Sequence, residues 1–153
     1  MALTFKTLSE NFAKVMNLDV KELGKFIGGK VQTNIDSGIF TNGCAIRMSY
    51  AFNYSGVEIP KSGYGATSSG KDGKWYLYRV ADIITFVKAK VGGTPLVGTT
   101  AEDFKGKKGV IIFSGCGWQD ATGHVDLFDG TKVMSDNGDY FGTCSKAELY
   151  VIS

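Results

Sequence analysis

The sequence predicts an α+β fold, with N-terminal helices followed by an antiparallel sheet. Apolar residues in the earlier part of the chain recur at helical spacing, whereas the last third has short apolar runs between glycine turns. The chain has 21 glycines and only 2 prolines, which favours a fold with many tight turns over a helix bundle. No internal repeat or evident linker divides the 153 residues, so residues 1–153 are expected to form one domain.

Helices are expected before the sheet. Phe12, Val15 and Met16 share one helical stripe after a plausible N-cap at Ser9. The expected helices are residues 9–18, residues 20–31 with a stop at Gly28–Gly29, residues 44–54 with Gly56 beyond them, and residues 79–93 with a stop at Gly92–Gly93. Residues 34–43 and 60–75 are rich in turn-forming residues and are expected to be loops.

The last third of the chain is expected to form the sheet. Its apolar runs are short and are separated by glycines, a pattern typical of antiparallel strands joined by tight turns. The expected strands are residues 109–115, 123–130, 131–136 and 147–153.

Composition and charge exclude several classes of protein. A formal net charge of +2 is too small to indicate nucleic-acid binding, and no apolar run reaches the roughly 20 residues of a membrane span. The N-terminal segment lacks the continuous apolar core of a secretory signal, so synthesis in the cytoplasm is expected. With one histidine and no closely spaced pair of cysteines, neither a metal site nor another cofactor is expected.

Cys44 is the candidate nucleophile. It follows Gly43 at the start of a predicted helix, where the helix dipole stabilises a thiolate and unpaired N–H groups can hold an oxyanion. Gly43 has no side chain, so a substrate carbonyl could approach the backbone there. A buried free cysteine is more often a small packing residue, and that alternative stays open at this point.

His124 is the only histidine and therefore the candidate general base. A three-residue loop centred on Gly130 would pair His124 with Asp136 and Leu127 with Val133.

Other acids and another register compete for this role. A two-residue Asp-Gly turn would instead place Ser135 opposite His124. Asp126, on the same strand face as His124, is the second candidate and Asp139 the third. For Asp126 an ordinary solvated carboxylate is the favoured interpretation.

Two motifs resemble the fourth family of type VI secretion amidase effectors. They are "NGCAIRMSYAFNYSGVEIP" and "GVIIFSGCGWQDATGHVDLFDG", in the order and at the separation found in that family. The resemblance implies a papain-like, NlpC-type cysteine hydrolase with Cys44 as nucleophile, His124 as base and Asp136 as the third residue of the triad.

The same resemblance implies a biological role. Such effectors are injected by the type VI secretion tube into the periplasm of a rival bacterium. There they cut peptidoglycan stem peptides, and the bond expected here is the γ-D-glutamyl–meso-diaminopimelate amide. A cognate immunity protein is the other expected partner. In the oxidising periplasm, Cys116 and Cys144 are hypothesised to form a disulfide, against the alternative of two free thiols.

Substrate contacts are predicted for few residues. Gly43 and Trp118 are the candidates, although Trp118 is equally well explained as a core aromatic. Arg47, one turn after Cys44, could meet a substrate carboxylate or pair with a local acid.

Two other functions stay open. The glycines and the 12% aromatic residues also suit a non-catalytic cell-wall or carbohydrate-binding module, and the Cys–His pair also suits an acyltransferase.

Overall fold

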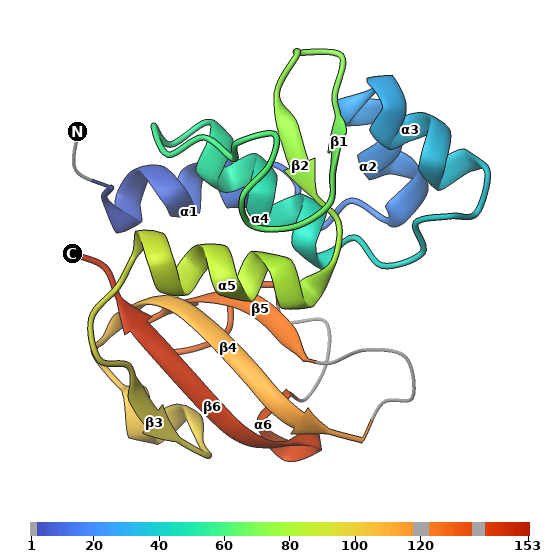
Figure 1. Ribbon diagram of the computed structural model, residues 1–153. Coiled ribbons are helices and arrows are strands. Elements are labelled where there is room, and N and C mark those ends of the chain that lie inside the picture. The colour runs from blue at the N-terminus through green and yellow to red at the C-terminus, as the bar shows by residue number, and fades with distance from the viewer. Residues whose placement is uncertain (1–2, 118–122, 136–139) are drawn as a thin grey trace.

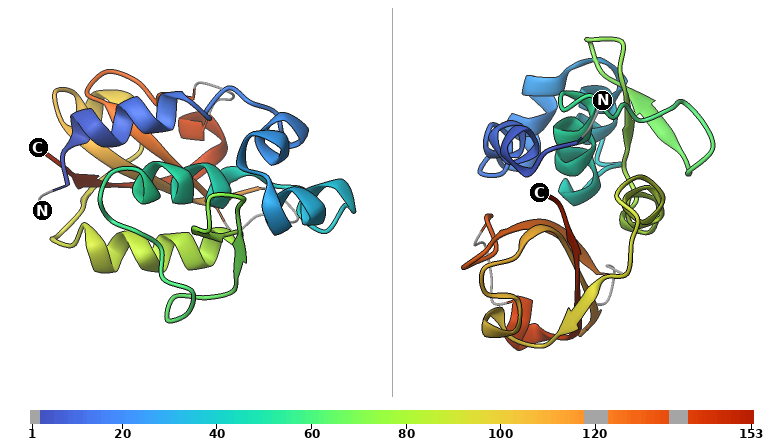
Figure 2. Two further views of the ribbon diagram at one scale, coloured as in Figure 1. Left: turned by 90° about the horizontal axis from the view of Figure 1, so that it is seen from above. Right: turned by 90° about the vertical axis from the view of Figure 1, so that its left-hand side faces the viewer.

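The computed structural model describes residues 3–117, 123–135 and 140–153, which form two layers (Figure 1). A helical layer lies on one face of a curved antiparallel sheet, and the two views of Figure 2 show the same division. The two ends of the chain lie side by side, and the Phe5 N–H donates to the Ser153 carbonyl oxygen at 2.9 Å. The predicted order of helices first and antiparallel sheet second is confirmed.

The helical layer begins earlier than expected. The first helix starts at Phe5 because Thr4, rather than Ser9, caps it by accepting the Thr7 N–H at 3.2 Å. Ser9 lies inside this helix. The helices of the layer are α1 (Phe5–Ala13), α2 (Val20–Ile27), α3 (Gly29–Asp36), α4 (Cys44–Asn53) and α5 (Val80–Lys90).

The prediction of a loop over residues 34–43 is wrong at its start, because helix α3 extends to Asp36. α2 ends at Gly28 as predicted, where a φ of 72° turns the chain, but a new helix begins at the next residue. This helix, α3, buries Val31 and Ile35, which are one turn apart. Packing of these two side chains therefore extends the helix to Asp36, through residues whose types favour a turn.

The prediction of a loop over residues 60–75 is also wrong in part, because this segment contains most of a β-hairpin. Strand β1 (Thr67–Ser69) pairs antiparallel with β2 (Trp75–Leu77). The hairpin is anchored to α4 through Ser49, whose hydroxyl accepts the Leu77 N–H at 3.0 Å. Tyr76 on β2 is fully buried. Tertiary contacts thus order this segment, although its glycines and serines predict an irregular loop.

The main sheet has the strand order β3-β6-β4-β5 and is antiparallel throughout. Its strands are β3 (Leu96–Gly98), β4 (Lys108–Cys116), β5 (His124–Asp129) and β6 (Cys144–Val151). The edge strand β3 has no counterpart among the expected elements. Two short helices, η1 (Ala101–Phe104) and α6 (Tyr140–Thr143), complete the described part of this layer.

Both hairpin registers considered for residues 123–136 are wrong. Val133 forms an isolated bridge with Phe128, not with Leu127, and residues 131–135 form no strand. The connecting loop has four residues because the Asp129 carboxylate accepts the N–H groups of both Thr131 and Lys132.

The core between the layers positions the site. α4 and α5 pack on the face of the sheet that carries the buried side chains Val110, Ile112, Val125 and Leu127. Every residue of α4 except Arg47 is buried. In the part of the chain that the structure describes, no helix combines the length and apolarity needed to cross a membrane.

Candidate active site

Cys44 lies where the N-terminus of α4 meets the free edge of β5. Its side chain is 5% exposed. The Val125 N–H donates to Cys44 Sγ at 3.3 Å, and the Val125 carbonyl oxygen lies at the same distance from Sγ. β5 is an edge strand, so no neighbouring strand pairs with these backbone groups of Val125. The sulfur atom of Cys44 contacts them instead. The thiol is therefore held by the backbone of the sheet.

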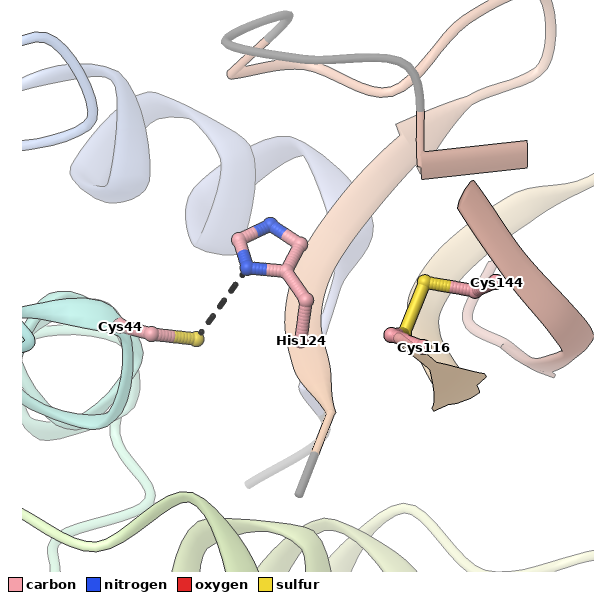
Figure 3. Close-up of a disulfide and its surroundings, with 4 residues drawn as sticks. All are labelled: Cys44, Cys116, His124 and Cys144. Atoms are coloured by element: carbon pink, nitrogen blue, oxygen red, sulfur yellow. Dashed lines mark hydrogen bonds between the residues drawn. A yellow bond between two sulfur atoms is a disulfide. The ribbon is translucent and has the colours of Figure 1, made fainter. Parts of the chain in front are cut away.

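His124 is the first residue of β5 and points toward Cys44, as Figure 3 shows. Its Nδ1 atom is 3.5 Å from Cys44 Sγ. Gly123, directly before it, passes so close to β4 that an added Cβ would lie 2.3 Å from the Phe113 carbonyl oxygen. A glycine is needed at that position for the chain to bring His124 onto the strand in register with Phe113.

Asp126 contacts the other nitrogen of the imidazole. His124 Nε2 lies 2.7 Å from Asp126 Oδ2. A carboxylate accepts hydrogen bonds, so Nε2 carries the proton in the neutral ring and Nδ1 is left to accept one from the thiol. This is the tautomer that a general base for Cys44 requires.

Asp126 itself is fully buried, so its interpretation as a solvated carboxylate is wrong. Its oxygens accept hydrogen bonds from the Leu127 N–H at 2.8 Å, from the Ser135 N–H at 3.3 Å and from the Ser135 hydroxyl. A buried charge is tolerated when it is hydrogen-bonded in this way. Ser135 therefore holds the acid that contacts His124.

Tyr140, the first residue of α6, stacks on His124. The two ring centroids are 3.9 Å apart, and the planes differ by 5°. Phe113 extends the stack, with its centroid 5.3 Å from that of Tyr140. An aromatic face next to the imidazole fixes the ring plane and favours its protonated form. Neither stacking partner was a candidate in the sequence, because Phe113 lies on β4 and Tyr140 on α6, and their approach to His124 depends on the tertiary fold.

The surroundings raise the pKa of His124 from 6.5 to about 9. Burial is the largest influence and disfavours the charged ring. It is outweighed by the negative charge of the Cys44 thiolate, the hydrogen bonds to Asp126 and Cys44, and the charge of Asp126. The site therefore favours the protonated form of His124.

The oxyanion donor expected at Cys44 already has a partner. The Cys44 N–H donates to Asn42 Oδ1 at 2.9 Å. A substrate oxygen can use this N–H only after the Asn42 side chain turns aside. Asn42 was not among the candidate residues, although an asparagine side chain often accepts the backbone N–H two residues further on, in an Asx turn.

Arg47 and Gly43 lie against each other beside the thiol. A Cβ atom on Gly43 would be 3.1 Å from the Arg47 guanidinium carbon and 3.0 Å from Leu23. The room left by Gly43 is therefore occupied by these side chains. Arg47 lines a small pocket of about 30 Å³ together with Cys44, His124, Asp126 and Tyr140.

Cys116 and Cys144 are joined by a disulfide between paired positions of β4 and β6 (Figure 3). Cys44 is the free cysteine. Cys144 directly follows α6, so the disulfide anchors the helix that carries Tyr140.

Three sequence candidates lie outside the described residues. They are Asp136, Asp139 and Trp118. Their predicted roles stay predictions. Of the sequence candidates, the structure brings together Cys44, His124 and Asp126, the acid that was ranked second.

The molecule is thus an α+β protein that brings a thiol and an imidazole together between a helical layer and an antiparallel sheet. The family model of type VI secretion system amidase effector protein 4 (Tae4) matches residues 40–150. The chain belongs to this family, and the resemblance read from its motifs is confirmed.

Solved structures of the family agree over the full length. A Tae4–Tai4 effector–immunity complex from Enterobacter cloacae is 40% identical, with a TM-score of 0.92 and 100% of both chains covered. The corresponding complex from Salmonella Typhimurium is 36% identical, also with a TM-score of 0.92 and full coverage of both chains. A crystal structure of the type VI effector Tae4 from Enterobacter cloacae is 41% identical, with a TM-score of 0.89, and the match covers 100% of this chain and 98% of that one. No curated protein matches the chain.

Proposed function

We propose that this chain is a cysteine amidase that hydrolyses peptidoglycan stem peptides at the γ-D-glutamyl–meso-diaminopimelate bond. The observation that carries the proposal is the distance of 3.5 Å between Cys44 Sγ and His124 Nδ1, with Nε2 held by Asp126. Membership of an amidase effector family supports the reaction class. The arrangement of a helix-borne thiol against a histidine on an antiparallel sheet supports a papain-like, NlpC-type architecture in one domain over residues 1–153.

The reaction is an acyl transfer to water. The Cys44 thiolate attacks the γ-carbonyl carbon, and a tetrahedral intermediate forms with its oxyanion near the N-terminus of α4. Protonated His124 gives its proton to the departing amine of diaminopimelate, which leaves a thioester on Cys44. Neutral His124 then removes a proton from water, the resulting hydroxide attacks the thioester, and the acid product and the thiol are released.

Asp126 keeps the imidazole in the tautomer that these steps need. Asp136, the acid implied by the family resemblance, has the same proposed role, and a variant of each residue separates the two. No metal or other cofactor takes part in the proposed reaction.

The proposed setting follows from the family. The chain is made in the cytoplasm, carried by the type VI secretion tube and released into the periplasm of the recipient cell. The solved complexes of its relatives with Tai4 support a cognate immunity protein as a partner of this chain.

Digestion of purified muropeptides tests the proposal. The wild-type protein should release a diaminopimelate-containing product with a free amine, identified by mass spectrometry, and Cys44→Ala should release none. Activity retained in the Cys44→Ala variant would contradict the mechanism. Transfer of the acyl group to an added amine, rather than to water, would identify an acyltransferase instead.

A further inference from the structure

Arg47 is a charged group of the pocket that the proposed chemistry does not use. It lies three residues after Cys44 on α4, and its side chain is partly buried. Its Nη2 donates to the Leu18 carbonyl oxygen at 2.9 Å. Its Nε is buried and has no hydrogen-bond partner among the described residues.

Among the described residues, no carboxylate forms an ion pair with Arg47, although the sequence left pairing with a local acid open. Asp126, the acid that shares the pocket, is already engaged by His124 and Ser135. A partly buried guanidinium with an unused N–H carries a desolvation cost that an anionic ligand would offset.

Gly43 allows the guanidinium to lie next to the nucleophile. A side chain at position 43 would occupy the space of the Arg47 guanidinium, whose Nη1 would be 3.2 Å from an added Cβ. The guanidinium therefore lies beside the residue that directly precedes Cys44, and Arg47 and Cys44 line the same pocket. An anion bound by Arg47 would lie near the atom that attacks the substrate.

We propose that Arg47 binds the α-carboxylate of the D-glutamyl residue whose γ-carbonyl is attacked by Cys44. This rests on the proposed function and assigns a subsite to it. In a γ-linked glutamyl residue, four carbon–carbon bonds of about 1.5 Å separate the α-carboxylate carbon from the scissile carbonyl carbon, a span of roughly 5 Å when extended. That span is short enough for one glutamyl residue to reach both Arg47 and Cys44, which line the same pocket. A guanidinium also suits a planar carboxylate better than a neutral carboxamide, because it can form a bidentate ion pair only with the carboxylate.

Two substrates that differ in this one group provide the test. They are the tetrapeptide with γ-linked D-glutamate and the same tetrapeptide with D-isoglutamine, in which the α-carboxylate is a neutral carboxamide. Wild-type kcat/KM should be roughly 10²-fold higher for the glutamate peptide. Arg47→Gln should reduce hydrolysis of the glutamate peptide to about the rate of the isoglutamine peptide, and should leave the latter within about threefold of wild type.

Two further variants complete the series. Arg47→Lys keeps the charge without the planar fork and should retain part of the preference. Arg79→Gln is the matched control, because Arg79 precedes α5 and lies over the ring of Tyr78, and it should keep the full preference.

The outcomes separate the alternatives. A preference that persists in Arg47→Gln, or its absence in the wild type, would overturn the proposal. So would an equal loss for both peptides, which is the result expected if Arg47 only stabilises the fold or the oxyanion. Hydrolysis of neither peptide by the wild type would instead refute the proposed function and, with it, this subsite.

Binding provides a second readout in case Arg47→Gln does not fold. The Cys44→Ala variant retains Arg47 and should bind the glutamate peptide at least about tenfold more tightly than the isoglutamine peptide in calorimetry. The difference should shrink as salt is added. Equal affinities for the two peptides would overturn the proposal without any Arg47 variant.

Discussion

The two layers of the molecule hold their parts of the site in different ways. Cys44 belongs to a helix in which every residue but Arg47 is buried, so apolar packing fixes its position. His124 begins an edge strand, and its position depends on Asp126, Ser135 and Tyr140. The nucleophile is therefore supported by the core and the base by polar and aromatic contacts. Damage to the sheet layer should therefore alter the base while the nucleophile stays in place.

The largest expected effect is loss of either member of the pair. Cys44→Ala and His124→Gln should each lower kcat/KM by on the order of 10⁴- to 10⁶-fold, because thiol and imidazole act as one unit. For the same reason the double variant should be no worse than either single one. Hydrolysis rates of muropeptides, with circular dichroism as the control for folding, measure this. Independent, multiplying losses would show that the two residues do not act together.

The next effect distinguishes the two candidate acids. Asp126→Asn should lower kcat by about 10²- to 10⁴-fold, because an amide can present its NH₂ to Nε2 and favour the wrong tautomer. Ser135→Ala should have a smaller effect of the same kind. If Asp136→Asn has the large effect and Asp126→Asn nearly none, Asp136 is the orienting residue and the proposed role of Asp126 is wrong.

Removal of the disulfide should affect the sheet layer specifically. The bond joins residues 28 apart in sequence, so a Cys116→Ser, Cys144→Ser variant should lose about 3–4 kcal/mol of unfolding free energy in denaturant titrations. Because α6 directly precedes Cys144, activity should also fall, while alkylation of Cys44 by iodoacetamide in the folded state should change little. Unchanged activity would show that α6 does not depend on the disulfide.

The smallest effect concerns the stack on His124. Tyr140→Leu should lower kcat/KM about tenfold and move the alkaline limb of the pH profile to lower pH, because an aromatic face stabilises imidazolium by roughly 0.5–2 kcal/mol. Tyr140→Phe keeps the ring and should retain most of both properties. Identical behaviour of the two variants would assign the effect to the hydroxyl group instead.

Local patterns predicted much of the fold. The start of α4 at Cys44, the end of α2 at Gly28 and the strands β4 and β5 are encoded by apolar spacing and by glycines near their ends. α3, the β1–β2 hairpin and the short edge strand β3 were missed. Residues typical of turns are ordered in α3 and the hairpin by packing against distant segments, which one stretch of sequence does not reveal.

The site was predictable in its pair of reactive residues and less so in its surroundings. Cys44 stood out through its glycine and helix start, and His124 as the chain's one histidine. Alternation along the strand placed Asp126 beside His124, but its burial depends on Ser135, whose approach follows from the four-residue loop after Phe128. A shift of that loop by one residue is invisible in the sequence and decides which residue of the returning segment lies opposite each position of β5.

An NMR titration of the one histidine tests the central claim most directly, namely that the imidazole lies between the Cys44 thiolate and Asp126. Spectra of protein labelled with ¹⁵N-histidine need no assignment and report both the pKa and the tautomer. The pKa should be about 9 in the wild type, with the proton on Nε2 in the neutral ring, and should fall in Cys44→Ala because the thiolate charge is lost. A wild-type pKa near 6.5 that does not respond to Cys44→Ala would contradict the claim.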